Sequence, residues 1–185
     1  MASDARVRYT KMVIKEQFAA LLATTSLNKI TVKEICEKAE INRATFYRYY
    51  TDAYDLLEKI EQEFLEDMFL KLADSISVGA KKVLILIMEK MKENISLYQA
   101  LFSENGDKQF IEKLFTLCYK EHAVNLHERF QNLPFQKQEF LFYFIAQGCS
   151  GILTQWLTHG MEMPIEEVAD FTEKLINNAI CGLCK

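Results

Sequence analysis

The chain has 185 residues, of which 50% are apolar, a formal net charge of −4, six glycines and two prolines. This much apolar sequence can build a sizeable core, and the scarcity of glycine, proline and period-2 alternation predicts an all-α fold. We expect no signal peptide, no membrane-spanning helix and, from five scattered cysteines, no disulfide framework. The predicted location is therefore the cytoplasm, with no membrane partner.

The charge is unevenly distributed along the chain. Residues 1–50 hold nine Lys and Arg against five Asp and Glu, a balance of +4, whereas residues 51–185 hold thirteen against twenty-one, a balance of −8. Attraction to phosphates is screened beyond a Debye length of about 10 Å and so depends on local charge. The N-terminal quarter is therefore predicted to face a polyanion.

Helical periodicity begins near the N-terminus. Residues 4–24 carry apolar positions at a 3.6-residue period and a basic side, on which Lys11 and Lys15 are expected to be solvated. The segment TVKE then has the capping-box pattern, with Thr31 and Glu34 three residues apart, and predicts a short helix to about residue 38.

A second short helix follows after a three-residue turn. Asn42 is placed to cap it, and Asp52 to cap a longer fourth helix that continues to about Leu72. Phe46 and Tyr50 are four residues apart and share a face, which predicts that they enter a small core together with Ile35 and Ala39 of the preceding helix. The other sides of this helix are left for phosphate anchoring and base readout in a major groove, which suits Arg43, Ala44, Tyr47 and Arg48, with Thr45 near the boundary.

The stretch ITVKEICEKAEINRATFYRYYTDAYDLL resembles the DNA-binding domain of the TetR/AcrR family of transcriptional regulators, over about residues 8–60. The resemblance implies a three-helix, helix-turn-helix DNA-binding domain in residues 1–52. It also implies a helical domain for dimerisation and effector binding in residues 53–185. No cofactor and no enzymatic activity are expected, because no phosphate loop, paired catalytic carboxylates or nucleophile-base constellation can be located. The expected function is that of a repressor that binds a palindromic double-stranded DNA operator as a homodimer and is released by a small-molecule effector.

The resemblance also assigns DNA contacts to particular residues. Phosphate contacts are expected from Thr31 and Lys33, base or nearby backbone contacts from Arg43, Ala44 and Thr45, and phosphate, sugar or base contacts from Tyr47, Arg48 and Tyr49. The sequence departs from the family pattern twice. Glu40 stands where a turn glycine is usual, so an unfavourable backbone conformation or a different turn is expected. Ala53 replaces a lysine that contacts phosphate, a contact that Thr51 or the helix N-terminus would have to supply.

Further helices are predicted near residues 80–98, 108–131, 137–158 and 165–183. Residues 140–157, FLFYFIAQGCSGILTQWL, are apolar nearly all round and are expected to be buried on several sides. The last two helices are predicted to pair with their symmetry mates in a four-helix bundle. The predicted interface consists of Gly148, Gly151, Ile152, Gln155, Phe171, Leu175 and Asn178. The alternative is that the same aromatic residues fill the core of a monomer.

An effector pocket is the other expected feature of the C-terminal region, and its predicted lining is Phe102, Phe110, Phe115, Tyr119, Phe142 and Phe144. An aromatic stripe at helical spacing is also typical of an ordinary core. No metal site is expected, because Cys181 and Cys184 form a lone CxxC pair and the three histidines are isolated. Two other functions are alternatives: a coregulator of this fold that binds a protein partner instead of DNA, and a helical enzyme, for which no catalytic constellation is present.

Overall fold

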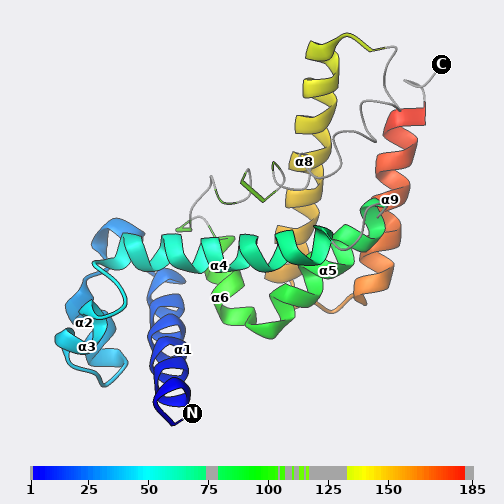
Figure 1. The fold of residues 1–185 in the computed structure, drawn as a ribbon. Helices are drawn as coiled ribbons and strands as arrows, with labels where there is room; N and C mark the ends of the chain where they lie inside the picture. Colours follow the sequence, from blue (N-terminus) through cyan, green and yellow to red (C-terminus); the bar gives the residue numbers. More distant parts are fainter. Residues whose placement is uncertain are drawn as a thin grey trace. The chain divides into compact units, whose positions relative to one another are not determined.

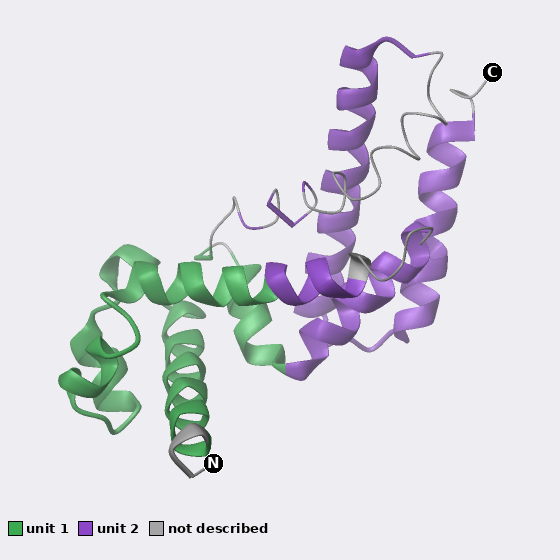
Figure 2. Ribbon diagram, in the orientation of Figure 1, with its two compact units in different colours: residues 1–64, 94–108 green, residues 65–93, 109–185 purple. Residues whose placement is uncertain are grey.

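The computed structural model describes residues 2–73, 79–103 and 133–181, together with a few positions between 105 and 116 (Figure 1). All regular elements in these residues are helical, which confirms the all-α prediction. The chain forms two compact units, which Figure 2 distinguishes by colour: residues 1–64 with 94–108, and residues 65–93 with 109–185. The first boundary between these units lies after residue 64, inside a helix, and not at residue 53. The expected functional boundary at residue 53 therefore stays a prediction.

The first unit is built around helix α1. It contains α1 (Ala2–Leu22), a single 3₁₀ turn (Leu27–Lys29), α2 (Val32–Lys38), α3 (Arg43–Tyr47), the first part of α4 (Ala53–Ala73) and α6 (Ile95–Leu101). Helix α1 packs against α2 and α6. Its apolar stripe is fully buried at Ile14, Phe18 and Leu22, and Phe64 of α4 meets Tyr98 of α6 with ring centroids 5.2 Å apart. This core is the support on which the two short helices rest.

The predicted continuous helix over residues 80–98 is wrong, because two helices occupy this region. Helix α5 (Ala80–Glu93) ends before Asn94, which has φ −150° and ψ 79°, and α6 begins after it. The side-chain oxygen of Asn94 accepts from the amide of Leu97 at 3.2 Å. An asparagine that caps a new helix in this way competes with continuation of the old one.

The second unit contains the remainder of α4, α5, α8 (Phe135–Thr158) and α9 (Ile165–Cys181). Helix α9 packs against α5 and α8. The Lys81 ammonium lies 2.5 Å from the carboxylate of Asp170, and the Lys81 amide donates to Glu173 at 3.2 Å, so α9 holds the start of α5. The predicted helix over residues 108–131 lies largely outside the described residues.

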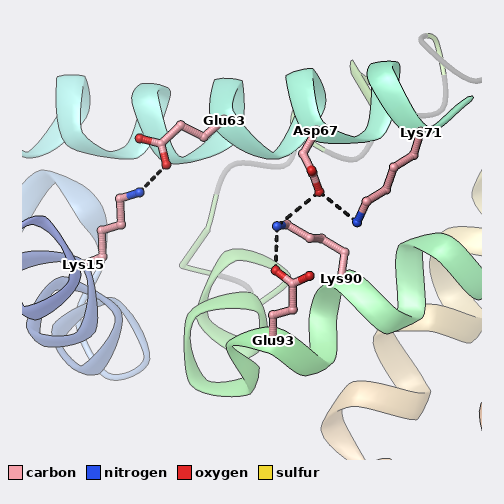
Figure 3. A network of polar contacts seen from close by, with 6 residues as sticks. All are labelled: Lys15, Glu63, Asp67, Lys71, Lys90 and Glu93. Atoms are coloured by element: carbon pink, nitrogen blue, oxygen red, sulfur yellow. Dashed lines mark hydrogen bonds and ion pairs between the residues drawn. The ribbon is translucent and has the colours of Figure 1, made fainter. Parts of the chain in front are cut away.

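Figure 3 shows two groups of ion pairs that involve helix α4. In the first unit, Lys15 of α1 pairs with Glu63 of α4 and is therefore not the solvated lysine that the sequence suggested. In the second unit, Lys90 of α5 lies 3.1 Å from Asp67 and 2.6 Å from Glu93. Burial raises the pKa of Asp67, but the hydrogen bonds and charges of Lys71 and Lys90 together outweigh burial and lower this pKa below its usual value.

Helix α8 carries the apolar stretch at residues 140–157, and only part of it is buried. Phe140 is 72% exposed, while Leu153 is fully buried. The expectation of burial on several sides is therefore wrong for the aromatic N-terminal half of this stretch. The sequence pattern shows which sides of a helix are apolar, but not which of them other elements cover. By length and composition alone, α8 is long and apolar enough to cross a membrane, as core helices of soluble proteins also are.

Candidate DNA-binding surface

Helix α2 begins with the predicted capping box. The hydroxyl oxygen of Thr31 accepts from the amide of Glu34 at 3.3 Å, and the Glu34 carboxylate accepts from the Thr31 amide at 2.9 Å and from its hydroxyl at 2.7 Å. These hydrogen bonds from the Thr31 side chain and backbone lower the pKa of Glu34. Both donors of Thr31 are thus occupied by a carboxylate, with which a DNA phosphate would have to compete. Lys33 is exposed and its nearest acidic partner, Glu37, is 3.7 Å away.

Of the two alternatives that the sequence left open for the turn between α2 and α3, the structure shows an unfavourable backbone conformation at Glu40. Glu40 has φ +52°, in the left-handed region, and the next amide, that of Ile41, donates to the carbonyl of Cys36 at 3.0 Å. A residue with a Cβ is strained in this region, whereas glycine is not. Glu40 thus occupies a backbone conformation that favours glycine.

The strain at Glu40 leads to a testable result. We expect Glu40→Gly to raise the free energy of unfolding by about 1 kcal/mol, because the left-handed conformation costs a non-glycine residue about 1–2 kcal/mol and part of the gain is lost to chain entropy. Urea denaturation measures this difference. The control is Glu40→Ala, which removes the carboxylate but keeps the Cβ, and an equal gain in both variants would contradict the backbone explanation.

Helix α3 has a capped start and one buried face. Asn42 accepts from the amide and the hydroxyl of Thr45 at 2.8 and 2.9 Å, as expected for its cap. Phe46 is 0% exposed and Tyr50 is 2% exposed, with ring centroids 5.5 Å apart, so the predicted core pair is confirmed. The nominated residues of α3 and its C-terminal end cover the remaining sides: Arg43, Ala44, Tyr47 and Arg48 are exposed, and Thr45 and Tyr49 are half-buried.

The junction between α3 and α4 contains residues that sequence reasoning missed. The Thr51 amide donates to Asp55 at 2.7 Å, and the Asp55 amide donates to Asp52 at 2.9 Å, which confirms Asp52 as a cap. Ala53, the position of the missing lysine, is buried. Carboxylates therefore already occupy the amides of Thr51 and Asp55, two of the groups that could replace the lost phosphate contact. The i,i+4 spacing of Asp55 and Lys59, whose atoms lie 2.9 Å apart, was the available signal.

Lys11 is also close to this surface. Its ammonium nitrogen lies 5.7 Å from the centroid of the Tyr49 ring, a distance at which a cation is attracted to an aromatic face. The sequence placed Lys11 on a solvated face, whereas the side chain is half-buried. The lysine of α1 thus adds positive charge beside the residues nominated for DNA contact.

The described residues among those nominated for an effector pocket belong to both units and differ in their burial. Phe102 is buried in the first unit, and Phe110 is buried in the second. In α8, Phe142 is half-buried and Phe144 is 65% exposed. Phe115 and Tyr119 lie outside the described residues. The pocket therefore stays a prediction.

The residues nominated for dimerisation lie on free surface of α8 and α9. Six of them are exposed and Ile152 is half-buried, the exposed ones being Gly148, Gly151, Gln155, Phe171, Leu175 and Asn178. A Cβ atom added at either glycine meets no atom within 4 Å. The chain itself therefore does not require small residues there. Within the described residues, no group of three His, Cys, Asp or Glu side chains could hold a metal ion, and Cys184 lies outside them.

Comparison with known proteins identifies the class to which this fold belongs. A TetR-type family model, described as a transcriptional regulator C-terminal region, matches residues 80–178. The match covers more than half of the chain, which therefore belongs to the TetR family of transcriptional regulators. The predicted resemblance is thus confirmed from a region that carried no motif. Transcriptional regulators of this family are non-enzymatic proteins.

Curated relatives resemble the chain over part of its length. It is 32% identical over 94 residues to the HTH-type dhaKLM operon transcriptional activator DhaS of Lactococcus lactis, covering 50% of this chain and 49% of that protein. It is 36% identical over 64 residues to the HTH-type regulator YxbF of Bacillus subtilis, covering 35% of this chain and 17% of the relative. The matches thus span half or less of these relatives.

Solved structures resemble the whole fold. A TetR transcriptional regulator from Streptococcus agalactiae has a TM-score of 0.65 at 23% identity, covering 95% of this chain and 98% of that one. FadR from Bacillus subtilis in complex with stearoyl-CoA has a TM-score of 0.64 at 16% identity, covering 89% and 96%. At these identities the likeness concerns the fold alone.

Proposed function

We propose that this protein is a cytoplasmic repressor of transcription that binds a palindromic DNA operator as a homodimer and is released by a small-molecule effector. The observation that carries the proposal is helix α3, where Arg43, Tyr47 and Arg48 are exposed while Phe46 and Tyr50 anchor the opposite face. Residues 1–52 would contact DNA, and residues 53–185 would dimerise and bind the effector.

Dimerisation follows from the size of the DNA-binding element. Helix α3 has five residues, Arg43–Tyr47, and offers only a few side chains to base edges. Each good bidentate contact contributes about 1–3 kcal/mol of discrimination, too little for one helix to select a site in a genome. Two such helices related by a two-fold axis would read an inverted repeat, with half-sites at least one helical turn apart, about 34 Å. The exposed glycine-containing surface of α8 and α9 supports this pairing.

We propose only the chemical class of the effector. One structural neighbour, FadR, is described in complex with stearoyl-CoA, which shows that this fold can hold an acyl thioester in that protein. This chain has several aromatic side chains in α8, including half-buried Phe142 and exposed Phe144. We propose an apolar effector, because pockets for small molecules are lined mainly by apolar and aromatic side chains.

A coregulator that binds a protein partner is the second candidate. The observation in its favour is that carboxylates occupy phosphate-binding positions: Glu34 holds both donors of Thr31, and Asp55 holds the Thr51 amide. A surface of this kind weakens the attraction to DNA at two places. The balance still favours DNA, because Lys33, Arg43 and Arg48 remain exposed.

Selection from a random duplex library decides between these functions. Wild-type protein is expected to enrich an inverted repeat, and gel shifts against DNA flanking its own gene would locate a natural copy. The absence of any enriched sequence at low salt would contradict DNA recognition and leave the coregulator. Fusion of the operator to a reporter promoter would then distinguish repression from activation.

Two substitutions separate base readout from phosphate contact. We expect Arg48→Ala to reduce the affinity for the selected operator more than the affinity for random DNA. Lys33→Ala is expected to weaken both about equally and to lower the salt slope by about one, since one phosphate contact is lost. Fluorescence anisotropy at several salt concentrations measures both quantities. A changed sequence preference in Lys33→Ala, or equal operator affinity in Arg48→Ala, would contradict these roles.

A further inference from the structure

The end of α3 is held by a group of polar contacts that starts on α4. The ammonium of Lys59 donates to the carbonyl oxygen of Tyr49 at 2.9 Å and lies 2.9 Å from Oδ2 of Asp55. The same carboxylate oxygen accepts from the amide of Thr51 at 2.7 Å. The Lys59 nitrogen also lies 5.5 Å from the centroid of the Tyr50 ring. One lysine and one carboxylate thus connect three consecutive residues to α4, all within the first unit.

Helix α3 needs such support because it is short. A helix of five residues has little stability of its own, and its last carbonyl groups lack intrahelical partners. At its start, Asn42 accepts from the Thr45 amide. Just beyond its end, Lys59 donates to the carbonyl of Tyr49, two residues after Tyr47, and places a positive charge near the helix C-terminus, where a cation is favourable. Both ends of α3 are therefore held by side chains, one from its own flank and one from α4.

The contacts of Lys59 also indicate that it does not act on DNA directly. Its ammonium is engaged by a carbonyl, a carboxylate and a ring of the protein, and the pKa of Asp55 is lowered, first by the Thr51 amide and then by Lys59. Such a group contributes to DNA binding through the placement of its partners. Base readout depends on placement within about 0.5 Å, whereas attraction to phosphates tolerates larger displacements.

We propose that Lys59 and Asp55 are positioning residues for DNA recognition, which fix the end of α3 so that Tyr47 and Arg48 reach base edges. The proposal rests on the proposed DNA-binding function. The Lys59 contacts then support discrimination between DNA sequences. They do not contribute to the general affinity for DNA.

The test compares Lys59→Met with a matched control. Methionine keeps an unbranched apolar chain beside Tyr50 but removes the charge and the donors. We expect operator affinity to fall about tenfold, the size of one lost charged hydrogen bond, while affinity for random duplex and the salt slope remain at wild-type values. The control is Lys71→Met, which removes an i,i+4 ion pair from the same helix, with Asp67 at 3.1 Å, in the other unit. It is expected to change neither affinity.

Two results would overturn the proposal. Unchanged operator affinity in Lys59→Met would show that α3 needs no such support, and equal weakening on both DNAs with a salt slope lower by about one would make Lys59 a phosphate contact. Failure of the wild type to bind any duplex would instead remove the proposed function. Amide hydrogen exchange without DNA then decides whether the end of α3 is held. Lys59→Met, and not Lys71→Met, is expected to speed exchange at Tyr49 and Tyr50, and equal rates would overturn the inference.

Discussion

Replacing Gly151 with glutamate is expected to convert the protein from a dimer to a monomer and to reduce operator affinity about 100-fold or more. A Cβ at this position meets nothing within 4 Å, so a single chain can accommodate the new side chain. In the proposed interface, however, two glutamates would be buried near each other across a two-fold axis, which is costly because each loses water without gaining a partner. Sedimentation velocity at micromolar concentration measures the first effect and anisotropy the second.

The controls for this experiment address the fold and the face. Leu175→Glu on α9, whose leucine is 45% exposed, is expected to have the same effect. Glu139→Lys changes the charge at an exposed position on the opposite side of α8 from Gly148 and is expected to leave the dimer intact. If Gly151→Glu and Leu175→Glu stay dimeric and bind operator normally, or if the wild type is itself a monomer, the interface is wrong.

Phe46→Ala is expected to lower the free energy of unfolding of the first unit by about 3–5 kcal/mol, more than any other substitution we propose. The ring is 0% exposed and lies against Tyr47 and Tyr50, with centroids 5.9 and 5.5 Å away. Its removal leaves a cavity beneath α3. Hydrogen exchange should therefore accelerate strongly in α2 and α3, with operator binding lost in parallel.

The neighbouring residue provides the matched control. Tyr47 is 56% exposed, so Tyr47→Ala should change stability by no more than about 0.5 kcal/mol while still reducing operator affinity. Amides of α8 and α9, which belong to the other unit, serve as an internal reference. Equal acceleration in both units would mean that they unfold together and that Phe46 stabilises the whole chain.

The features of the DNA-binding region that could be predicted from sequence are local ones. Thr31 and Asn42 cap helices whose first turns follow directly, and Phe46 and Tyr50 are one helical turn apart, so spacing alone determines their roles. The break at Asn94 was missed because the flanking residues continue a helical pattern, and the competing cap is a weak signal. The bond from Lys59 to the Tyr49 carbonyl could not be predicted from spacing, since it joins α4 to the segment after α3 and depends on the geometry of the junction between them.

The C-terminal region shows a different limit. Phe140 and Leu153 belong to one uninterrupted apolar stretch, yet the first is 72% exposed and the second is fully buried. Both are large apolar residues, so hydrophobicity alone predicts burial for both. What separates them is which neighbours cover each side of α8, and this is decided by tertiary packing and by any second copy of the chain.

The turn between α8 and α9 gives the protein an optical probe of its own. Gly160 and Met161 both have positive φ, and across this turn the indole N–H of Trp156 donates to the carbonyl of Met163 at 2.9 Å, with the side chain only 6% exposed. Trp156 is the single tryptophan of the chain. Excitation at the long-wavelength edge of the protein absorption, where only tryptophan absorbs, therefore reports on the surroundings of this one buried side chain without an added label. A shift of the Trp156 emission to longer wavelength on titration with a compound would reveal that the hairpin of α8 and α9 has loosened, even in the presence of DNA.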